Sequence, residues 1–325
     1  AYLKGQGKEV VYDAEHFFDG YRRNPDYARQ TIEKARQAGA DWIVLCDTNG
    51  GTLPHEIEKM TAEIALIVPP EKLGIHAHND GGLGIANTLA AVRAGARMVQ
   101  GTINGYGERC GNADLIPIIA NLQLKMGMNC LSGEAMNHLT NLSNYVGDVA
   151  NITPLNSRPF VGRSAFAHKG GVHVSAILKN PLAYEHIAPE LVGNKQRVLV
   201  SDLAGKSNIE YKARELGIDL GQDNGISRRI VDEIKRLEDE GYQFDAAEGS
   251  LSLLIKKITG EFVEPFTLEC FHVIASKTAH HPSLAQATIK ISVGGEEELT
   301  AAEGNGPINA LDNALRKALT KFYPQ

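Results

Sequence analysis

The chain has 325 residues, 43% of them hydrophobic and 22% charged, a balance typical of a globular protein with a sizeable core. No apolar run is long enough to span a bilayer, and a net charge of -6 with mixed signs argues against binding to nucleic acid. The four cysteines lie far apart without a CxxC spacing, which argues against disulfides or a cysteine-based zinc site and favours a cytoplasmic protein.

Short apolar strands alternate with amphipathic helices through the first 130 residues. The pattern predicts strands at residues 10–12, 42–46, 73–76 and 97–100. Residues 13–20 are predicted to form a loop, and Asn24 and Asn112 are predicted to cap the first and the last of the helices. Strands that alternate with helices indicate a parallel sheet.

The loops after these four strands carry polar side chains, and in a (β/α)₈ barrel the chemistry takes place on such loops. The residues concerned are Glu15, Thr48, His76, His78, Glu108 and Asn112. Side chains two apart on a strand point to the same side, so His76 and His78 could bind one metal ion. One core histidine beside one helix-capping histidine is the alternative. Polar residues at the same end of successive strands favour the metal site.

A complete barrel needs eight strands, and about 250 residues are typical. Only four strands precede the change of pattern near residue 130. We therefore expect residues 1–130 to be the C-terminal half of a TIM barrel that lacks its first half, because an open half-barrel would expose its strand edges.

The rest of the chain divides into two further domains. Residues 131–260 are predicted to be mainly helical linker subdomains. Residues 261–325 change to a period of two, with strands predicted at 266–274, 287–293 and 297–302 and a final helix with an apolar stripe. This β-β-β-α unit is predicted to be a separate regulatory domain of the α+β type.

Two motifs carry a family resemblance. The segment that contains His76 and His78, at 73–86, resembles the HxH-[ND]-D-x-G signature of the 2-isopropylmalate, homocitrate and citramalate synthases. The segment at 105–113 is similar to their GxGER-x-GNA loop. Three further stretches, at 13–20, 45–54 and 185–194, resemble the citramalate synthase branch most closely, and the β-β-β-α tail resembles half of the family's regulatory domain.

The resemblance implies a metal-dependent acyltransferase that condenses acetyl-CoA with pyruvate to give citramalate and CoA, a step toward isoleucine. By this resemblance His76, His78 and Asn112 bind a divalent Zn, Mn or Mg ion. It also implies a homodimer and an amino-acid effector, isoleucine, near the turn at 304–307.

The resemblance assigns roles to further residues. Glu15 matches the loop glutamate near the reacting centre, while His173 and Tyr184 match the accessory pair that the linker contributes, often across the dimer. Thr48 matches the residue that holds the carboxylate of the 2-oxo acid, and Glu108 lies in the motif predicted to bind substrate.

Each of these residues also has a purely structural interpretation. Glu15 could be a surface acid, and Asn112 could serve only as a helix cap. Glu108 could form an internal ion pair with its neighbour Arg109. The linker residues His173 and Tyr184 could be a packed core histidine and a buried anchor.

The family's first barrel strand carries an arginine–aspartate pair, in which the aspartate is a metal ligand, and this sequence contains no such motif. We therefore expect the chain alone to be inactive, as a fragment of a longer enzyme. The alternatives are a 2-isopropylmalate synthase that uses 2-oxoisovalerate, and a non-catalytic module for dimerisation and effector binding. An aldol-type lyase of the same barrel superfamily is a further alternative, against which the regulatory tail argues.

Overall fold

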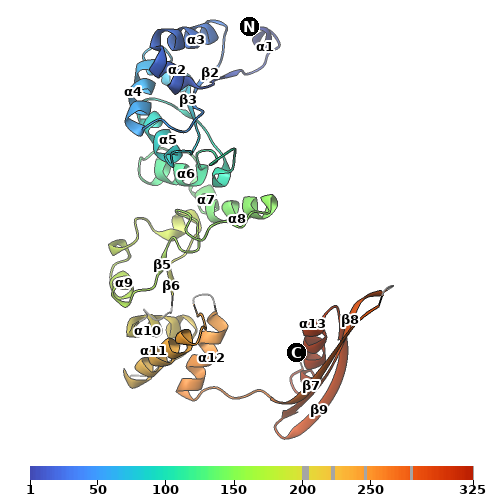
Figure 1. The fold of residues 1–325 in the computed structure, drawn as a ribbon. Helices are drawn as coiled ribbons and strands as arrows, with labels where there is room; N and C mark the ends of the chain where they lie inside the picture. The colour runs from blue at the N-terminus through green and yellow to red at the C-terminus, as the bar shows by residue number, and fades with distance from the viewer. Residues whose placement is uncertain (200–204, 221–223, 245–246, 279–280, 325) are drawn as a thin grey trace. The chain divides into compact units, whose positions relative to one another are not determined.

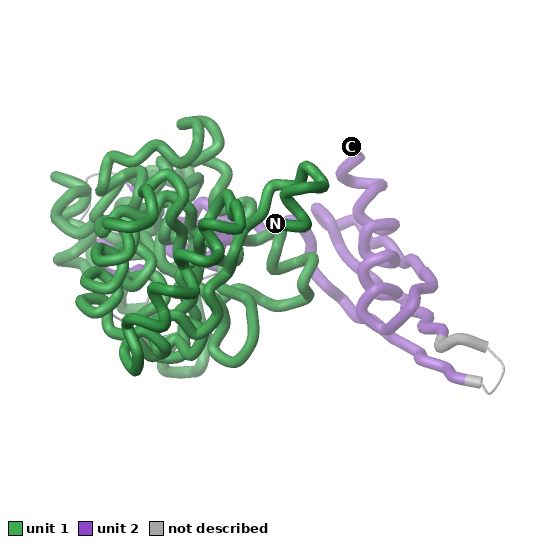
Figure 2. Tube along the Cα trace, turned by 90° about the horizontal axis from the view of Figure 1, so that it is seen from above, with its two compact units in different colours: residues 1–219, 231–247 green, residues 220–230, 248–325 purple. Residues whose placement is uncertain are grey.

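The computed structural model describes residues 1–199, 205–220, 224–244, 247–278 and 281–324 (Figure 1). The chain forms two compact units (Figure 2). The first comprises residues 1–219 and 231–247, and the second comprises 220–230 and 248–325. Among the helices within the described residues, none combines the length and the apolar character needed to cross a membrane.

A four-stranded parallel sheet organises the first unit, with the strands side by side in chain order. The strands are β1 (Val11–Ala14), β2 (Trp42–Asp47), β3 (Leu73–Ala77) and β4 (Met98–Gln100). All four were predicted, because each is a short apolar run that ends in polar residues. The sheet and its helices form the predicted half of a (β/α)₈ barrel.

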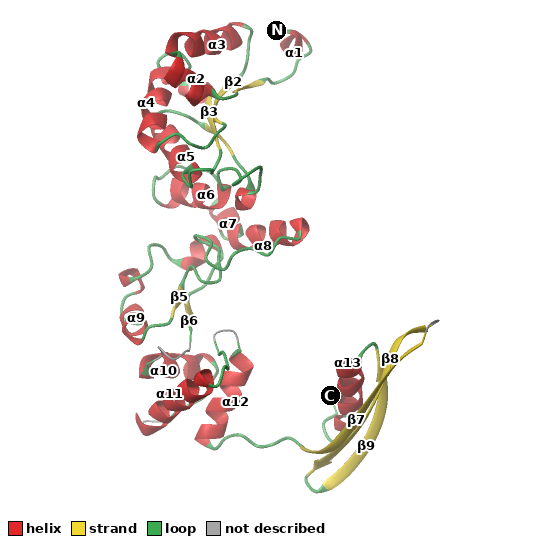
Figure 3. Cartoon of the chain, in the orientation of Figure 1, coloured by secondary structure: helices red, strands yellow, loops and turns green. Residues whose placement is uncertain are grey.

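Helices follow the strands and pack on one face of the sheet (Figure 3). They are α2 (Phe17–Arg23), α3 (Pro25–Gln37), α4 (Pro54–Ala65), α5 (Gly84–Arg93) and α6 (Leu115–Leu124), after a first turn α1 (Tyr2–Gly5). The predicted loop at residues 13–20 is wrong in its second half, where α2 begins. Phe17 and Phe18 bury their rings in the core, and this burial stabilises a helix that lacks a capping side chain.

Register assigns the side chains to the two faces of the sheet, because successive residues of a strand point to opposite sides. Cys46 pairs with His76 and His76 pairs with Gln100, so these three side chains share one face. Asp13 lies on the same face, since it pairs with Val44, two residues before Cys46. We call this surface the site face. The intervening residues, such as Ile75, pack against the helices.

A hydrogen bond between side chains of the two edge strands indicates that the sheet is strongly curved. The Nε2 of Gln100, on β4, donates to Oδ1 of Asp13, on β1, over 3.1 Å. Neighbouring strands lie about 4.8 Å apart, so a flat sheet would separate β1 from β4 by roughly 14 Å. Curvature of this kind is what a segment of a barrel requires.

The linker region is mainly helical, as predicted, with one addition. Two very short strands, β5 (Ala167–His168) and β6 (Arg197–Val198), pair in parallel. The helices are α7 (Gly133–Met136), α8 (Leu139–Ala150), α9 (Gly171–Ile177), α10 (Lys206–Glu215), α11 (Asn224–Asp239) and α12 (Glu248–Thr259).

Two buried or half-buried contacts fasten the linker to the long loop after β4. The Oγ of Ser143 donates to Oδ1 of Asn104 over 2.6 Å, and the Nδ2 of Asn104 donates to the carbonyl oxygen of Ser143. The Arg158 guanidinium pairs with Asp114 at 2.6 Å. The loop that carries Asn112 is therefore held from both sides by the linker.

The second unit contains the predicted β-β-β-α arrangement, an antiparallel sheet in the order β7-β8-β9. Its elements are β7 (Thr267–Thr278), β8 (His281–Val293), β9 (Glu296–Gly304) and α13 (Pro307–Leu319). Gly294 and Gly295 both have positive φ, as the tight turn between β8 and β9 requires. Small residues such as Ala310 and Ala314 let α13 lie close to the sheet.

Candidate functional site

His76 stands at the carboxyl end of β3 with both ring nitrogens facing side-chain oxygens. Its Nδ1 lies 2.9 Å from Oε1 of Gln100, and its Nε2 lies 3.1 Å from Oδ1 of Asn112. The ring of His78 is its neighbour, with ring centroids 5.2 Å apart. The structure thus brings together the three residues predicted to bind a metal ion.

Both amides are held in one orientation by a second hydrogen bond. The Nδ2 of Asn112 donates to the carbonyl oxygen of Tyr106 over 3.2 Å, so Oδ1 must face His76. The Nε2 of Gln100 donates to Asp13, so Oε1 of Gln100 also faces the imidazole. A neutral imidazole has one N–H and one lone pair, and it can therefore donate to only one of the two oxygens.

The remaining nitrogen of His76 meets an acceptor with its own lone pair, an arrangement that a cation between the two atoms would stabilise. Nε2 of His76 and Oδ1 of Asn112 lie 3.1 Å apart, and an imidazole nitrogen and an amide oxygen are ligand types that divalent metal ions accept. These donor atoms therefore suit a divalent metal ion.

His78 adds a buried ring nitrogen, Nδ1, that has no hydrogen-bond partner among the described residues. Burial, followed by the neighbouring His76 and Arg109, lowers the pKa of His78, which favours the neutral form that binds metals. Within the described ranges no three His, Cys, Asp or Glu side chains cluster as a metal site. The candidate site depends on the amide of Asn112 as its third ligand.

Arg109 ties together the loops that follow β2, β3 and β4. Its guanidinium binds both carboxylate oxygens of Asp80, at 2.7 and 3.0 Å, and donates to the carbonyl oxygen of Thr48 at 2.7 Å. This pairing lowers the pKa of Asp80. Glu108 also forms an ion pair with Arg109, at 3.9 Å, but Glu108 is 86% exposed, so this pair is at the surface and not internal.

Two more predicted residues lie at this edge of the sheet. The Oγ1 of Thr48 accepts a hydrogen bond from the backbone N–H of His16 over 2.8 Å, which leaves the hydroxyl hydrogen free to donate. Glu15 is exposed after β1, and its charge acts on the pKa of both His78 and Cys46. Its placement among these groups goes beyond that of an isolated surface acid.

Asn112 does not cap the following helix. Asp114 is the cap of α6 and accepts from the backbone N–H of Ile116 over 3.1 Å. Asn112 instead forms an isolated bridge with His78. The cap prediction was wrong because Asp114, two residues later, offers a short carboxylate at the turn where the helix begins.

His173 and Tyr184 form a second group, in which the ring centroids are 4.3 Å apart. His173 is exposed and Tyr184 is 49% exposed, so neither is a packed core side chain. Behind them, Nε2 of His168 lies 3.1 Å from Oε1 of Glu185, and both of these side chains are buried. Among the residues that the structure describes, no hydrogen bond or ring contact joins this group to His76 or His78.

Sequence reasoning missed three residues of the site: Gln100, Asp13 and Asp80. Gln100 and Asp13 are polar residues at or near the ends of short strands, which is a usable signal. Their partnership depends on curvature that the sequence pattern does not reveal. Asp80 lies inside the HxH motif, but its pairing with Arg109 joins residues 29 positions apart.

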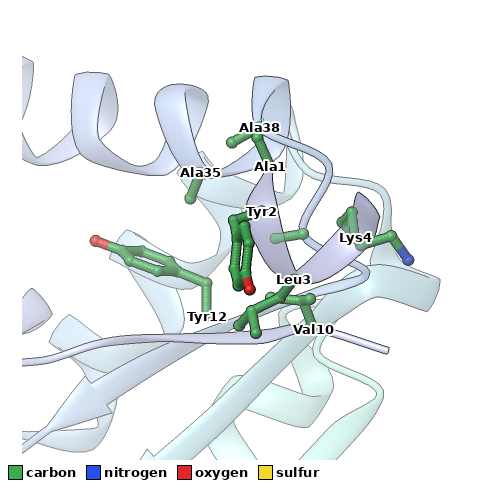
Figure 4. A pocket seen from close by; sticks show the side chains of 9 residues that line it. Ala1, Tyr2, Leu3, Lys4, Val10, Tyr12, Ala35 and Ala38 are labelled. Carbon is green, nitrogen blue, oxygen red and sulfur yellow. The ribbon is translucent and has the colours of Figure 1, made fainter. Parts of the chain in front are cut away.

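A pocket at the other end of β1 is not part of this site (Figure 4). It has a volume of about 290 Å³ and lies among α1, α3 and the start of β1, with Tyr2, Leu3 and Tyr12 in its wall. Its lining is mostly apolar, and only Lys4 contributes a charge. That charge is already paired with Asp41 at 2.8 Å.

The reactivity of Cys46 tests whether its thiol is buried on the site face. Burial, aided by Asp13 and Glu15, raises the pKa of its thiol to about 12. Because the thiolate is the reactive form, we expect Cys46 to be alkylated by iodoacetamide at pH 8.5 roughly a hundredfold or more slowly than the exposed Cys110. Mass spectrometry of timed samples measures both rates.

The same shift has a consequence for stability. The folded chain holds the Cys46 proton more tightly than the unfolded chain does. The stability that the protonated thiol gives the folded state is therefore lost as the pH rises from 9.0 toward about 12.

In the alkylation test, labelling of Cys46 at the rate of Cys110 in the folded protein would show that the thiol is not buried on the site face.

Gly111 allows the loop that presents Asn112 to fold tightly. Its φ is +87°, and a Cβ at this position would lie 2.0 Å from the carbonyl oxygen of Gly105. We expect Gly111→Ala to lower the free energy of unfolding by about 1–3 kcal/mol more than the control Gly127→Ala. Gly127 has a similar φ of +67° but open space around it. Urea unfolding measures both, and equal losses would contradict the close packing of this loop.

Three protein-family models match successive parts of the chain. The HMGL-like model matches residues 1–146, the homocitrate synthase post-HMGL domain-like model matches 160–242, and the LeuA allosteric (dimerisation) domain model matches 245–323. The first 146 residues are therefore similar to the HMGL-like family, and the two segments that follow are similar to its post-HMGL and LeuA dimerisation domains.

Curated relatives include citramalate synthases and a 2-isopropylmalate synthase. An (R)-citramalate synthase from Synechocystis sp. is 53% identical over 100% of this chain and 61% of its own length. An (R)-citramalate synthase from Aquifex aeolicus is 53% identical over 99% of this chain and 61% of its own. A 2-isopropylmalate synthase from Methanocaldococcus jannaschii is 33% identical over 98% and 60%.

These comparisons confirm the family resemblance drawn from the two motifs and the three-part fold. The chain spans 61% of the length of each of the two citramalate synthases.

Proposed function

We propose that the whole protein is a citramalate synthase that condenses acetyl-CoA with pyruvate and releases CoA. The observation that carries the proposal is 53% identity to (R)-citramalate synthases across this chain, together with the convergence of His76, His78 and Asn112. Relatives named 2-isopropylmalate synthase are only 33% identical, so that alternative has less support.

The site would hold a divalent Zn, Mn or Mg ion through Nε2 of His76, Oδ1 of Asn112 and the ring of His78. When bound, such an ion supplies a Lewis acid that polarises the ketone of the 2-oxo acid. The Thr48 hydroxyl, with its hydrogen free, donates to the carboxylate of the same acid. Arg109 fixes the Thr48 backbone, and Glu108 lies beside Arg109 at the substrate-facing loop.

Carbon–carbon bond formation needs a base, because the acetyl methyl group is a weak carbon acid. The exposed carboxylate of Glu15 removes the proton, and the enolate carbon attacks the ketone carbon. The resulting alkoxide takes up a proton, and water then hydrolyses the thioester to release CoA and the free acid. His173 is the second candidate for the base.

In this proposal the protein is a homodimer, and His173 and Tyr184 of one copy act on the site of the other copy. Support comes from the LeuA dimerisation model at residues 245–323 and from the exposure of both side chains. The same domain model is named allosteric, and we propose isoleucine as the effector, bound near residues 304–307. Calorimetric titration of isoleucine into the protein tests this point, and a lack of any binding heat would refute it.

The experiment that tests the function is CoA release from acetyl-CoA, followed with a thiol reagent, with either pyruvate or 2-oxoisovalerate as acceptor. We expect kcat/KM for pyruvate to exceed that for 2-oxoisovalerate by at least about tenfold, which corresponds to about 1.4 kcal/mol in the transition state. A preference for 2-oxoisovalerate would identify a 2-isopropylmalate synthase instead. No release with either acid would refute both.

A further inference from the structure

We propose that Gln100 is a positioning residue for His76, and that it selects the imidazole tautomer that can bind metal. In this proposal Oε1 of Gln100 accepts the Nδ1–H of His76, which leaves the lone pair on Nε2 directed at the metal position beside Asn112. The proposal rests on the proposed function in one respect, namely that a metal ion is bound there.

The first support is the direction of the hydrogen bonds across the sheet. The carboxylate of Asp13 can only accept, so the amide of Gln100 must turn its Nε2 toward Asp13, over 3.1 Å. Its Oε1 is then left for Nδ1 of His76, over 2.9 Å. A reversed amide would place oxygen against carboxylate and N–H against the imidazole.

The second support is that Nδ1 makes the closer of the two contacts, since it lies 2.9 Å from Oε1 of Gln100 while Nε2 lies 3.1 Å from Oδ1 of Asn112. Asn112 turns its Oδ1 toward Nε2 of His76, because its Nδ2 is engaged with the carbonyl oxygen of Tyr106. With Gln100 accepting at Nδ1, the neutral ring directs a lone pair at the position between Nε2 and Oδ1. The two hydrogen bonds thus run in the same direction: Nδ1–H of His76 donates to Gln100, and the amide of Gln100 donates to Asp13.

The third support is that Gln100 is placed by rigid elements. It ends β4 as the register partner of His76 on β3, so the two side chains rise side by side from the site face. Partners that orient a metal-binding histidine are typically important for affinity, and their loss costs about 10–100-fold in metal binding or activity. Gln100 has the position and the acceptor that this role requires.

The test uses Zn²⁺ alone, with its Kd measured by competition against a chromophoric chelator. We expect Gln100→Met, which keeps the side-chain length but removes the acceptor, to raise the Kd about 10–100-fold. Gln100→Glu combined with Asp13→Asn keeps an acceptor for Nδ1–H of His76 and a donor between the two edge strands, so this double variant should retain most of the affinity. Gln286→Met is the matched control, since Gln286 also donates from a strand to a carboxylate, Glu303, over 2.9 Å, but lies in the second unit.

A second readout begins with the unaltered protein. In the metal-free, unaltered protein, ¹⁵N chemical shifts of the imidazole should show the Nδ1–H tautomer of His76, and Gln100→Met should lose that single tautomer. An Nε2–H tautomer in the unaltered protein would overturn the proposal even if Gln100→Met failed to fold. Zn²⁺ affinity in Gln100→Met equal to that of the unaltered protein, or an equal loss in the double variant Gln100→Glu with Asp13→Asn, would also overturn it.

Neither readout involves acetyl-CoA or a 2-oxo acid, so the two proposals fail separately. A protein that binds Zn²⁺ through an oriented His76 but does not turn over pyruvate would contradict the proposed function alone. Turnover of pyruvate with an unchanged Zn²⁺ affinity in Gln100→Met would contradict only the role of Gln100.

Discussion

Replacing His76 by alanine should abolish tight binding of a divalent metal ion and lower turnover by about a thousandfold. The imidazole contributes one of the three converging donor atoms, and its Nε2 lies 3.1 Å from Oδ1 of Asn112. A Lewis acid at this position supplies several kcal/mol of transition-state stabilisation, which corresponds to a rate factor of about a thousand. Calorimetric titration with Zn²⁺ and the CoA-release assay measure the two effects.

The matched control is His55→Ala, because His55 is an exposed histidine on α4 and, among the described residues, no hydrogen bond or ring contact joins it to His76, His78 or Asn112. It should leave both measurements unchanged. Asn112→Leu should reproduce the loss seen in His76→Ala, since it removes the second converging donor. Retention of normal Zn²⁺ affinity in His76→Ala would contradict the site described here.

Replacing His168 by alanine should destabilise the protein by about 3–5 kcal/mol, because it leaves the carboxylate of Glu185 buried without its partner. Nε2 of His168 lies 3.1 Å from Oε1 of Glu185, and the side chains are 9% and 2% exposed. Tyr184 contacts both His168 and His173, so the tilted ring contact between His173 and Tyr184 should loosen as well. Urea unfolding gives the change in free energy.

Two controls separate burial from simple loss of an ion pair. Arg93→Ala removes a surface pair with Glu58, at 3.0 Å and with side chains 64% and 41% exposed, and should cost less than about 1 kcal/mol. The double variant His168→Leu with Glu185→Met removes both polar groups and should recover most of the loss. A loss below that of Arg93→Ala would mean that His168 is not needed to satisfy Glu185.

The parallel sheet could be predicted from the sequence because each strand is a short apolar run covered by helices. Trp42–Asp47 and Leu73–Ala77 have this character, and the structure confirms both with small shifts at their ends. Helix α2 could not be predicted, since its start at Phe17 has no capping side chain and depends on aromatic rings buried against the rest of the core. Tertiary burial decided the outcome there.

The candidate site was predictable in its loops but not in its contacts. His76 and His78 follow from their spacing, and Asn112 follows from the second motif. The partnership of Gln100 with Asp13 depends on the curvature of the sheet, which brings two edge strands together. Adjacency in sequence revealed only the weaker partner of Arg109, because the fold brings its guanidinium to 2.7 Å from Asp80 while its pair with the exposed Glu108 spans 3.9 Å.

The most direct test of the metal site is anomalous X-ray diffraction from crystals of the protein soaked in Zn²⁺. We expect one strong anomalous peak within about 2.0–2.2 Å of both Nε2 of His76 and Oδ1 of Asn112, with the ring of His78 as a further ligand. A peak elsewhere on the molecule, or no peak between His76 and Asn112 at saturating Zn²⁺, would contradict the central claim that these loops form a metal site.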